Sequence, residues 1–220
     1  MKKTDLVAVL SIAAVTLLTV GVYPHLSSEV VTHFDASGEP NGTMSRPVFA
    51  VFCPLLGAGL WSFHRFLVPR IQPSIGTKRA AYGMSEAMWA RTQLSILFVI
   101  LGVHVFLLRY AMVPERHAVH VFVPLLLGVV ALVLALALPR VTPNPFVGVR
   151  VPWTRASPAI WAKTHRIAGY TYFGAFLGCV TALFLPSKVA SPVALGCFLM
   201  GSLVPVVYSA WLARGRPSAP

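Results

Sequence analysis

Six long runs of hydrophobic residues dominate the sequence, and shorter polar segments separate them. The runs cover approximately residues 5–23, 47–67, 92–112, 121–138, 167–185 and 192–212. A helix needs about 20 apolar residues to cross a hydrocarbon core of about 30 Å. The pattern therefore predicts an all-α fold, a polytopic membrane bundle of about six transmembrane helices.

The composition supports a chain that is surrounded by lipid. Only 11% of the 220 residues are charged, and the mean hydropathy of +0.74 lies above the range of soluble domains.

The first run follows Lys2 and Lys3 as a signal peptide would, but no convincing cleavage site precedes Tyr23, so we expect a retained anchor. The three cysteines fall in predicted spans and form no metal-binding motif. We expect no metal and no cofactor.

The distribution of Lys and Arg predicts the orientation of the helices. With a cytoplasmic N-terminus, the residues left outside are Arg46, Arg109, Arg116 and Lys188, so that fourteen of the eighteen Lys and Arg lie inside. The positive-inside rule favours this arrangement, with both termini in the cytoplasm. The net charge of +12 thus reflects topology, and we expect no direct nucleic-acid binding. We also expect no carboxylate within the membrane, which argues against proton-coupled transport.

Two of the predicted cytoplasmic loops contain an internal repeat. One loop begins with PRIQP at 69–73 and ends with SEAMWARTQ at 85–93, and the other begins with PRVTP at 139–143 and ends with SPAIWAKTH at 157–165. Five of the nine positions in the longer segments are identical, and the offsets between the copies are 70 and 72 residues. The sequence therefore predicts two helix–loop–helix units of the same orientation.

The second loop, 139–166, has residues that the first lacks. Gly148 and Pro152 restrict the backbone on either side of Arg150. Ser157 is suited to cap the next helix, with Pro158 at its first position.

Further along the same helix, Trp161, His165 and Gly169 are spaced to share one face, which we expect to turn inward.

These residues define a candidate binding site on the cytoplasmic side. No Asp or Glu follows Glu115, so a pocket in this half of the chain is net positive and suits an anion. The candidate residues are Arg150, Trp153, Thr154, Trp161, His165 and Arg166. Two alternatives stay open: the Lys and Arg residues as a class could serve only topology, and His165 could simply lie at the membrane interface.

The predicted outer loop, 24–46, and His104 hold the remaining candidates. The acids and histidines of the loop match no compact metal motif. We expect an ordered cap with His33 and Phe34 packed against the helices, and we name His33 and Asp35 as candidates for contact with an external ligand. His104 lies inside a span, where it is either functional or forms a structural hydrogen bond between helices.

The second loop resembles the signature of the SdpI family of bacterial membrane proteins. The matching residues are Asn144, Gly148, Arg150, Pro152, Trp153, Thr154, Ser157, Trp161, Thr164, His165, Arg166 and Gly169. The first half, with Tyr23-Pro24, Thr32-His33-Phe34 and Ser45-Arg46, is similar to a domain of unknown function that often precedes it. We therefore expect an N-terminal membrane domain at 1–91, with an inner loop at 68–91, and an SdpI-like four-span domain at 92–220.

The resemblance implies an immunity protein of the bacterial inner membrane. Relatives protect the cell against a secreted toxic peptide, and a relative of this kind can hold a transcriptional repressor at the membrane. Membrane lipids, a toxic peptide and a repressor are thus the expected partners. The chain shows no nucleophile–base pair, Walker loop or zinc site, so we expect no enzyme. The alternative is a transporter or handler of lipids or peptides with a cationic cytoplasmic pocket.

Overall fold

The computed structural model describes residues 2–35, 37–67, 70, 86–144 and 146–214. They form two compact units, which are described separately. The first contains the chain as far as α4 and the start of α5, and the second contains the rest of α5 and the helices after it. The predicted domain boundary at 91/92 remains a prediction, because compactness alone groups α4 with the helices that precede it.

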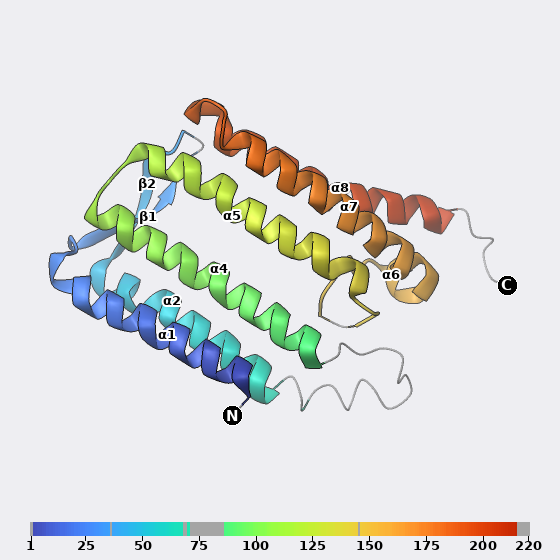
Figure 1. The fold of residues 1–220 in the computed structure, drawn as a ribbon, viewed down its shortest axis with the longest axis horizontal. Helices are drawn as coiled ribbons and strands as arrows, with labels where there is room; N and C mark the ends of the chain where they lie inside the picture. The colour runs from blue at the N-terminus through green and yellow to red at the C-terminus, as the bar shows by residue number, and fades with distance from the viewer. Residues whose placement is uncertain (1, 36, 68–69, 71–85, 145, 215–220) are drawn as a thin grey trace. The chain divides into compact units, whose positions relative to one another are not determined.

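The first unit is built on three long helices. Its elements are α1 (Lys3–Val22), η1 (Tyr23–His25), β1 (Glu29–Phe34), β2 (Pro40–Ser45), α2 (Arg46–Ser62), the π-helical turn η2 (Phe63–Leu67) and α4 (Glu86–Met112). In Figure 1, α1, α2 and α4 run side by side. Ala8 of α1 packs with Leu97 and Leu101 of α4. Small residues allow this close packing, since a Cβ on Gly57 of α2 would lie 2.9 Å from Leu97.

The hairpin of β1 and β2 is the one part of the first unit that the all-α expectation did not include. The strands pair antiparallel, with Val30 opposite Met44, and Gly38 has a φ of 77° in the turn that joins them. Leu26 and Val30 pack with Phe49 of α2 and with Leu107 of α4. The segment is therefore an ordered cap on the helices, as expected.

The second unit consists of helices joined by short connections and one longer loop. Its elements are α5 (Arg116–Ala137), whose first four residues belong to the first unit, η3 (Leu138–Arg140), α6 (Pro152–Ala156), α7 (Pro158–Ala182) and α8 (Ser187–Arg214). Helices α7 and α8 are antiparallel neighbours (Figure 1), because Tyr172 bonds to Ser202 while Cys179 bonds to Ala194.

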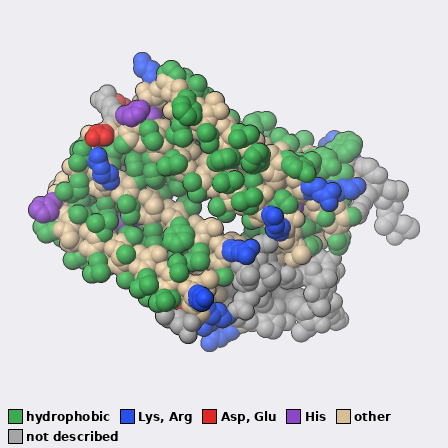
Figure 2. Space-filling view, viewed as in Figure 1, with side chains coloured by type: hydrophobic (Ala, Val, Ile, Leu, Met, Phe, Trp, Pro, Cys, Tyr) green, Lys and Arg blue, Asp and Glu red, His purple; other side chains and the backbone are tan. Residues whose placement is uncertain are grey.

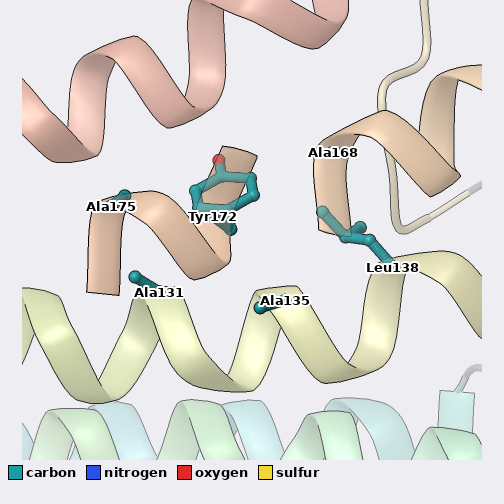
Figure 3. Packing of buried hydrophobic residues seen from close by; sticks show 6 residues of the cluster. All are labelled: Ala131, Ala135, Leu138, Ala168, Tyr172 and Ala175. Carbon is teal, nitrogen blue, oxygen red and sulfur yellow. The ribbon is translucent and has the colours of Figure 1, made fainter. Parts of the chain in front are cut away.

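Small side chains bring α5 and α7 together. Ala131 and Ala135 of α5 pack with Ala168 and Ala175 of α7, with Tyr172 beside them (Figure 3). Gly169 of α7 also lies close to this chain segment, since a Cβ there would be 3.2 Å from the Ala135 carbonyl oxygen of α5 and 2.4 Å from Pro139 Cγ of η3. This is the packing expected where van der Waals contact, rather than the release of water, holds helices together.

The surface of the helices confirms a polytopic membrane protein. Five helical segments are long and apolar enough to cross a bilayer, and they correspond to α1, α2, α4, α5 and α8. Figure 2 shows hydrophobic side chains over most of the visible face. On these helices, large apolar residues such as Leu17 (71% exposed) and Leu55 (66%) point away from the protein, as expected for side chains in contact with lipid.

The predicted span at 167–185 corresponds to α7. This helix has 25 residues, but Lys163, His165 and Arg166 occupy its first turns, so that its mean hydropathy is lower than that of the other five. The count of six spans therefore remains a prediction.

The repeat prediction falls partly outside the described residues, which exclude 71–85 and the side chain of Trp89. Trp89 and Trp161 do both lie in the first turns of long helices, α4 and α7.

Candidate functional site

Asn144 shapes the start of the loop between η3 and α6. Its side-chain oxygen accepts hydrogen bonds from the backbone N–H groups of Phe146 (2.8 Å) and Val147 (2.7 Å). Its amide group donates to the carbonyls of Thr142 (2.9 Å) and Val147 (3.0 Å). A side-chain amide has two donor and two acceptor positions, so all four are used within the loop. Asn144 therefore has a structural role in the loop.

His165 fastens the same loop to α7. Its ring is 1% exposed and stacks on Trp161 with centroids 4.1 Å apart. Nδ1 lies 2.8 Å from the Trp161 carbonyl, which can only accept, so Nδ1 carries the proton. Nε2 then accepts from the Val149 backbone N–H at 3.1 Å. Both ring nitrogens are thus engaged, and the ring is held in its neutral form.

Gly148 makes this contact possible. Its φ of +121° is a conformation that other residues rarely adopt. A Cβ at this position would lie 2.2 Å from His165 Nε2, which is closer than any non-bonded contact allows. Glycine is therefore required for the loop backbone to reach the buried histidine.

Thr154 holds the loop from the other side. Its hydroxyl, on α6, lies 2.7 Å from the Val149 carbonyl and 2.9 Å from the Val151 carbonyl. The Thr154 side chain is buried, at 1% exposed. The backbone at Val149 and Val151, on either side of Arg150, is consequently held by side chains from α6 and α7.

The two tryptophans of the loop complete the attachment. Trp161 is 1% exposed, and its Nε1 donates to the Val141 carbonyl at 2.7 Å. Trp153 reaches α8, where its Nε1 donates to Ser209 Oγ at 2.9 Å. Ser157 accepts from the Ile160 N–H and caps α7, as predicted. The signature residues therefore tie η3, α6, α7 and α8 into one structure.

Two segments of the chain match known protein families. A match to the SdpI/YfhL protein family covers residues 140–209, which span the loop, α6, α7 and most of α8. Residues 140–209 are thus similar to the SdpI/YfhL family. A second match, to a domain of unknown function (DUF1648), covers residues 10–58. No curated protein and no solved structure gave a significant match. The suspected resemblance is thereby confirmed for these two segments of a polytopic membrane protein.

The exposed cations of the SdpI segment have a different role from its buried residues. Arg150, Arg155, Lys163 and Arg166 are all exposed. Within the described residues, the ion pairs are Asp5 with Arg65 and Glu115 with Arg109, so none involves these four. None of the four is therefore neutralised by a carboxylate of the described residues.

The structure divides the predicted anion site into two groups. Thr154, Trp161 and His165 are buried and used for internal bonds, and Trp153 is half-buried with its indole N–H bonded to Ser209. The inward-facing surface of Trp161, His165 and Gly169 is confirmed. The site as a whole stays a prediction, and its exposed members are Arg150 and Arg166.

The outer-loop candidates have local roles in the hairpin. Phe34 packs edge-on against Tyr110 of α4, with centroids 4.8 Å apart. His33 is exposed and bonds to Thr32, so the expectation that it also packs on the helices is wrong. Asp35 Oδ1 accepts from Ser37 and from the Glu39 backbone N–H. These bonds, first that from the Ser37 hydroxyl, lower the pKa of Asp35.

His104 forms the structural bond between helices that was one of its two expected roles. The ring is fully buried and stacks on Phe49 of α2 with centroids 4.8 Å apart. Thr19 of α1 donates its only proton to the Val15 carbonyl, so His104 Nε2 donates to Thr19 Oγ1 at 2.9 Å. The three helices of the first unit thus meet at one polar contact.

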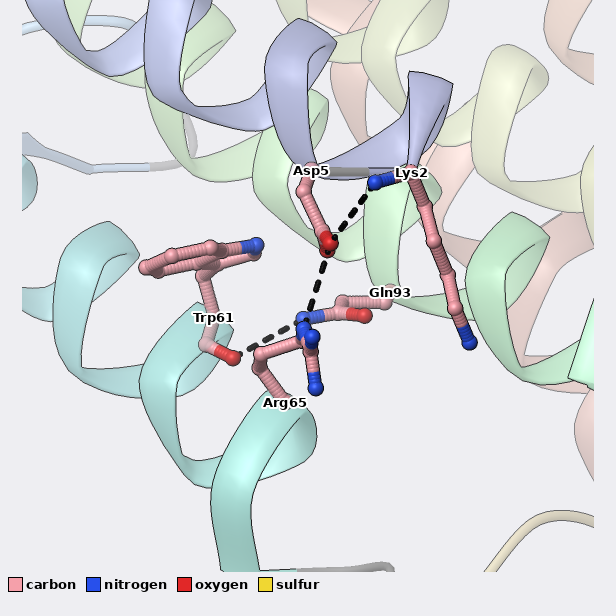
Figure 4. Close-up of polar contacts among 5 residues, drawn as sticks. All are labelled: Lys2, Asp5, Trp61, Arg65 and Gln93. Carbon is pink, nitrogen blue, oxygen red and sulfur yellow. Dashed lines mark hydrogen bonds and ion pairs between the residues drawn. The ribbon is translucent and has the colours of Figure 1, made fainter.

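Asp5 is a residue that the sequence reasoning missed. We expected no carboxylate in a span, yet Asp5 lies in the first turn of α1 and is only 6% exposed. It pairs with Arg65 of η2 at 3.1 Å (Figure 4). Next to this pair, Gln93 of α4 donates to the Trp61 carbonyl. An acid at the start of one apolar run and an arginine at the end of the next was the available signal.

Proposed function

We propose that the protein is an SdpI-type immunity factor of the bacterial inner membrane, with both termini in the cytoplasm. It protects the cell against a membrane-active toxic peptide. The observation that carries the proposal is the family match over residues 140–209, which coincides with the loop that Asn144, Thr154 and His165 hold in place.

The bonding of the SdpI loop supports a role other than catalysis. A general base needs a free nitrogen or oxygen within reach of substrate. Both nitrogens of His165 are engaged by the backbone, and the Thr154 hydroxyl is directed at two carbonyls. We therefore propose that the protein acts by binding and is not an enzyme.

Two surfaces suit the proposed partners. The hairpin is the ordered outer element under the proposed topology, and a secreted peptide would contact it before the helices. On the opposite side, the exposed cations of the SdpI loop could be approached by an acidic surface of a repressor. In this proposal the protein both protects against the peptide and relays a signal by binding the repressor.

One observation favours a second candidate, a handler of lipids or peptides. The sequence contains no carboxylate after Glu115 that could neutralise the exposed cations of the second unit, which include Arg150, Arg155, Lys163 and Arg166. A carrier of anionic lipids would use such a surface. A carrier would change the distribution of lipid or peptide between the two leaflets, whereas an immunity factor would change survival alone.

The test is deletion of the gene, followed by exposure of the cells to a panel of membrane-active peptides, with survival and transcript levels recorded together. We expect loss of survival against at least one peptide and its restoration by the full-length gene on a plasmid. Unchanged survival across the panel, together with altered leaflet distribution of a fluorescent lipid, would favour the carrier instead.

A further inference from the structure

Arg150 differs from the other exposed cations of the second unit in the way its backbone is held. The Val149 N–H is bound by His165, and the carbonyls of Val149 and Val151 both face the Thr154 hydroxyl. Gly148, with its φ of +121°, sets the direction of the chain just before. Three contacts from buried side chains thus hold the backbone of the two residues that flank an exposed side chain. Such fixing reduces the entropy that is lost when a ligand binds.

The chemistry of Arg150 and its surroundings points to an anion. A guanidinium group binds phosphate through two parallel hydrogen bonds. The side chain is exposed, it belongs to no ion pair among the described residues, and the sequence after Glu115 contains no carboxylate. The partner of Arg150 must therefore come from outside the second unit.

The position of this loop along the membrane normal indicates which anion lies near Arg150. Trp153, three residues after Arg150, bonds to Ser209 of α8. Two residues further along α8, Trp211 is 67% exposed and stacks on Tyr208. Trp and Tyr side chains at the end of a membrane helix mark the level of the lipid head groups. The phosphates of the bilayer lie at this level, so they are favoured over an acidic protein in solution.

We propose that Arg150 is a recognition residue for the phosphate group of an anionic phospholipid, and that Thr154 and His165 are positioning residues that fix its backbone. Lipid binding of this kind does not require the proposed immunity role. It would give the SdpI segment a defined lipid molecule at its surface, beyond the general attraction of basic residues to a negative membrane.

The experiment measures lipid binding to the full-length protein in detergent by titration calorimetry. Short-chain phosphatidylglycerol is the anionic probe and short-chain phosphatidylcholine is the zwitterionic reference. At about 1 M salt the Debye length falls to about 3 Å, so general attraction is screened while a direct contact persists. We expect the wild type to prefer phosphatidylglycerol under these conditions.

Variants separate a specific contact from general charge. Arg150→Ala should weaken phosphatidylglycerol binding by about tenfold, and Arg150→Lys should recover only part of it, because the ammonium group lacks the planar pair of donors. Arg155→Ala, an exposed arginine on α6, is the matched control and should change binding by less than about twofold in high salt. Equal losses for Arg150→Ala and Arg155→Ala, or no loss for Arg150→Ala, would overturn the proposal.

A second set of variants tests the positioning role. Thr154→Val removes the hydroxyl with little change of shape, and it should lower the preference for phosphatidylglycerol, while Thr154→Ser should retain it. A preference that survives Thr154→Val in full would overturn the positioning role.

Competition by inorganic phosphate distinguishes the two sources of the anion. Displacement of the lipid only by excess phosphate supports a lipid site, whereas tight phosphate binding without lipid preference contradicts it. Survival under peptide challenge is recorded separately, so failure of lipid binding leaves the immunity proposal intact.

Discussion

Arg150 and Arg155 are both exposed arginines, but only the first lies on a backbone fixed by buried side chains. If the SdpI loop carries out the proposed protection, Arg150→Ala should reduce survival under peptide challenge by about tenfold, the loss expected for one charge-assisted contact. Protein levels should not change, because an exposed arginine contributes little to stability. Colony counts and a membrane immunoblot measure both quantities.

Arg155→Ala is the control for this prediction and should survive like the wild type. A disappearance of the Arg150→Ala protein from the membrane would show that Arg150 has a structural role instead.

Gly148 provides a sharper test of the structure itself. Gly148→Ala places a Cβ 2.2 Å from His165 Nε2 and strains the φ of +121°. We expect the protein to lose about 3 kcal/mol of stability, from backbone strain and displacement of the ring together. Thermal unfolding in detergent, followed by tryptophan fluorescence, measures this.

Gly174→Ala is the matched control, because a Cβ there would have nothing within 4 Å. A melting temperature for Gly148→Ala equal to that of this control would contradict the described loop.

At the scale of elements, aromatic contacts add to the aliphatic packing that holds the hairpin to α4. Phe34 packs against Tyr110 and Phe106, while its neighbour His33 is exposed. Phe34→Ala should weaken docking of the hairpin by about 2 kcal/mol, and backbone amides of β1 should then exchange faster with solvent. Hydrogen–deuterium exchange measured by mass spectrometry provides the test.

His33→Ala should leave exchange in the hairpin unchanged. If the two variants exchange alike, the packing of Phe34 on α4 does not hold the hairpin.

Elements that depend on residues close together in the sequence could be predicted, whereas those that depend on contacts between distant residues could not. The helices could be predicted because each long apolar run corresponds to one of them. The cap on α7 was equally local, requiring only Ser157 and Pro158. The hairpin was missed because Gly38, Pro40 and Gly42 indicate turns, and the sequence does not show that Val30 packs on residues of α4.

The residues of the candidate site could be predicted from the sequence, but their hydrogen bonds could not. The repeat and the signature identified Arg150, Thr154 and His165. That His165 binds the backbone of Val149 could not be foreseen, because this bond depends on how the loop folds back on α7. The Asp5 pair was missed for the same reason, as its partner is 60 residues away.

At the scale of the whole molecule, the proposed topology predicts which loops are accessible from each side. In a variant without native cysteines, Ser187→Cys should react with a membrane-impermeant reagent on intact cells, and Ala156→Cys should react only after the membrane is opened. Both positions are exposed in the structure. The expectation rests on the excess of Lys and Arg in the proposed cytoplasmic segments.

Gel-shift labelling of the two variants provides the readout. Reaction of Ala156→Cys from outside intact cells would invert the topology and place the SdpI loop on the opposite face.

The contact between His104 and Thr19 has a consequence for biosynthesis. A polar ring in the middle of a hydrophobic helix is unfavourable in lipid unless a partner helix covers it. The partner, Thr19, belongs to the helix that is synthesised first, and Phe49, which stacks on the ring, belongs to the second. When α4 leaves the ribosome, both are already available beside the insertion machinery. The order of the helices along the chain thus allows α4 to bury its polar ring against helices that precede it, without waiting for those that follow.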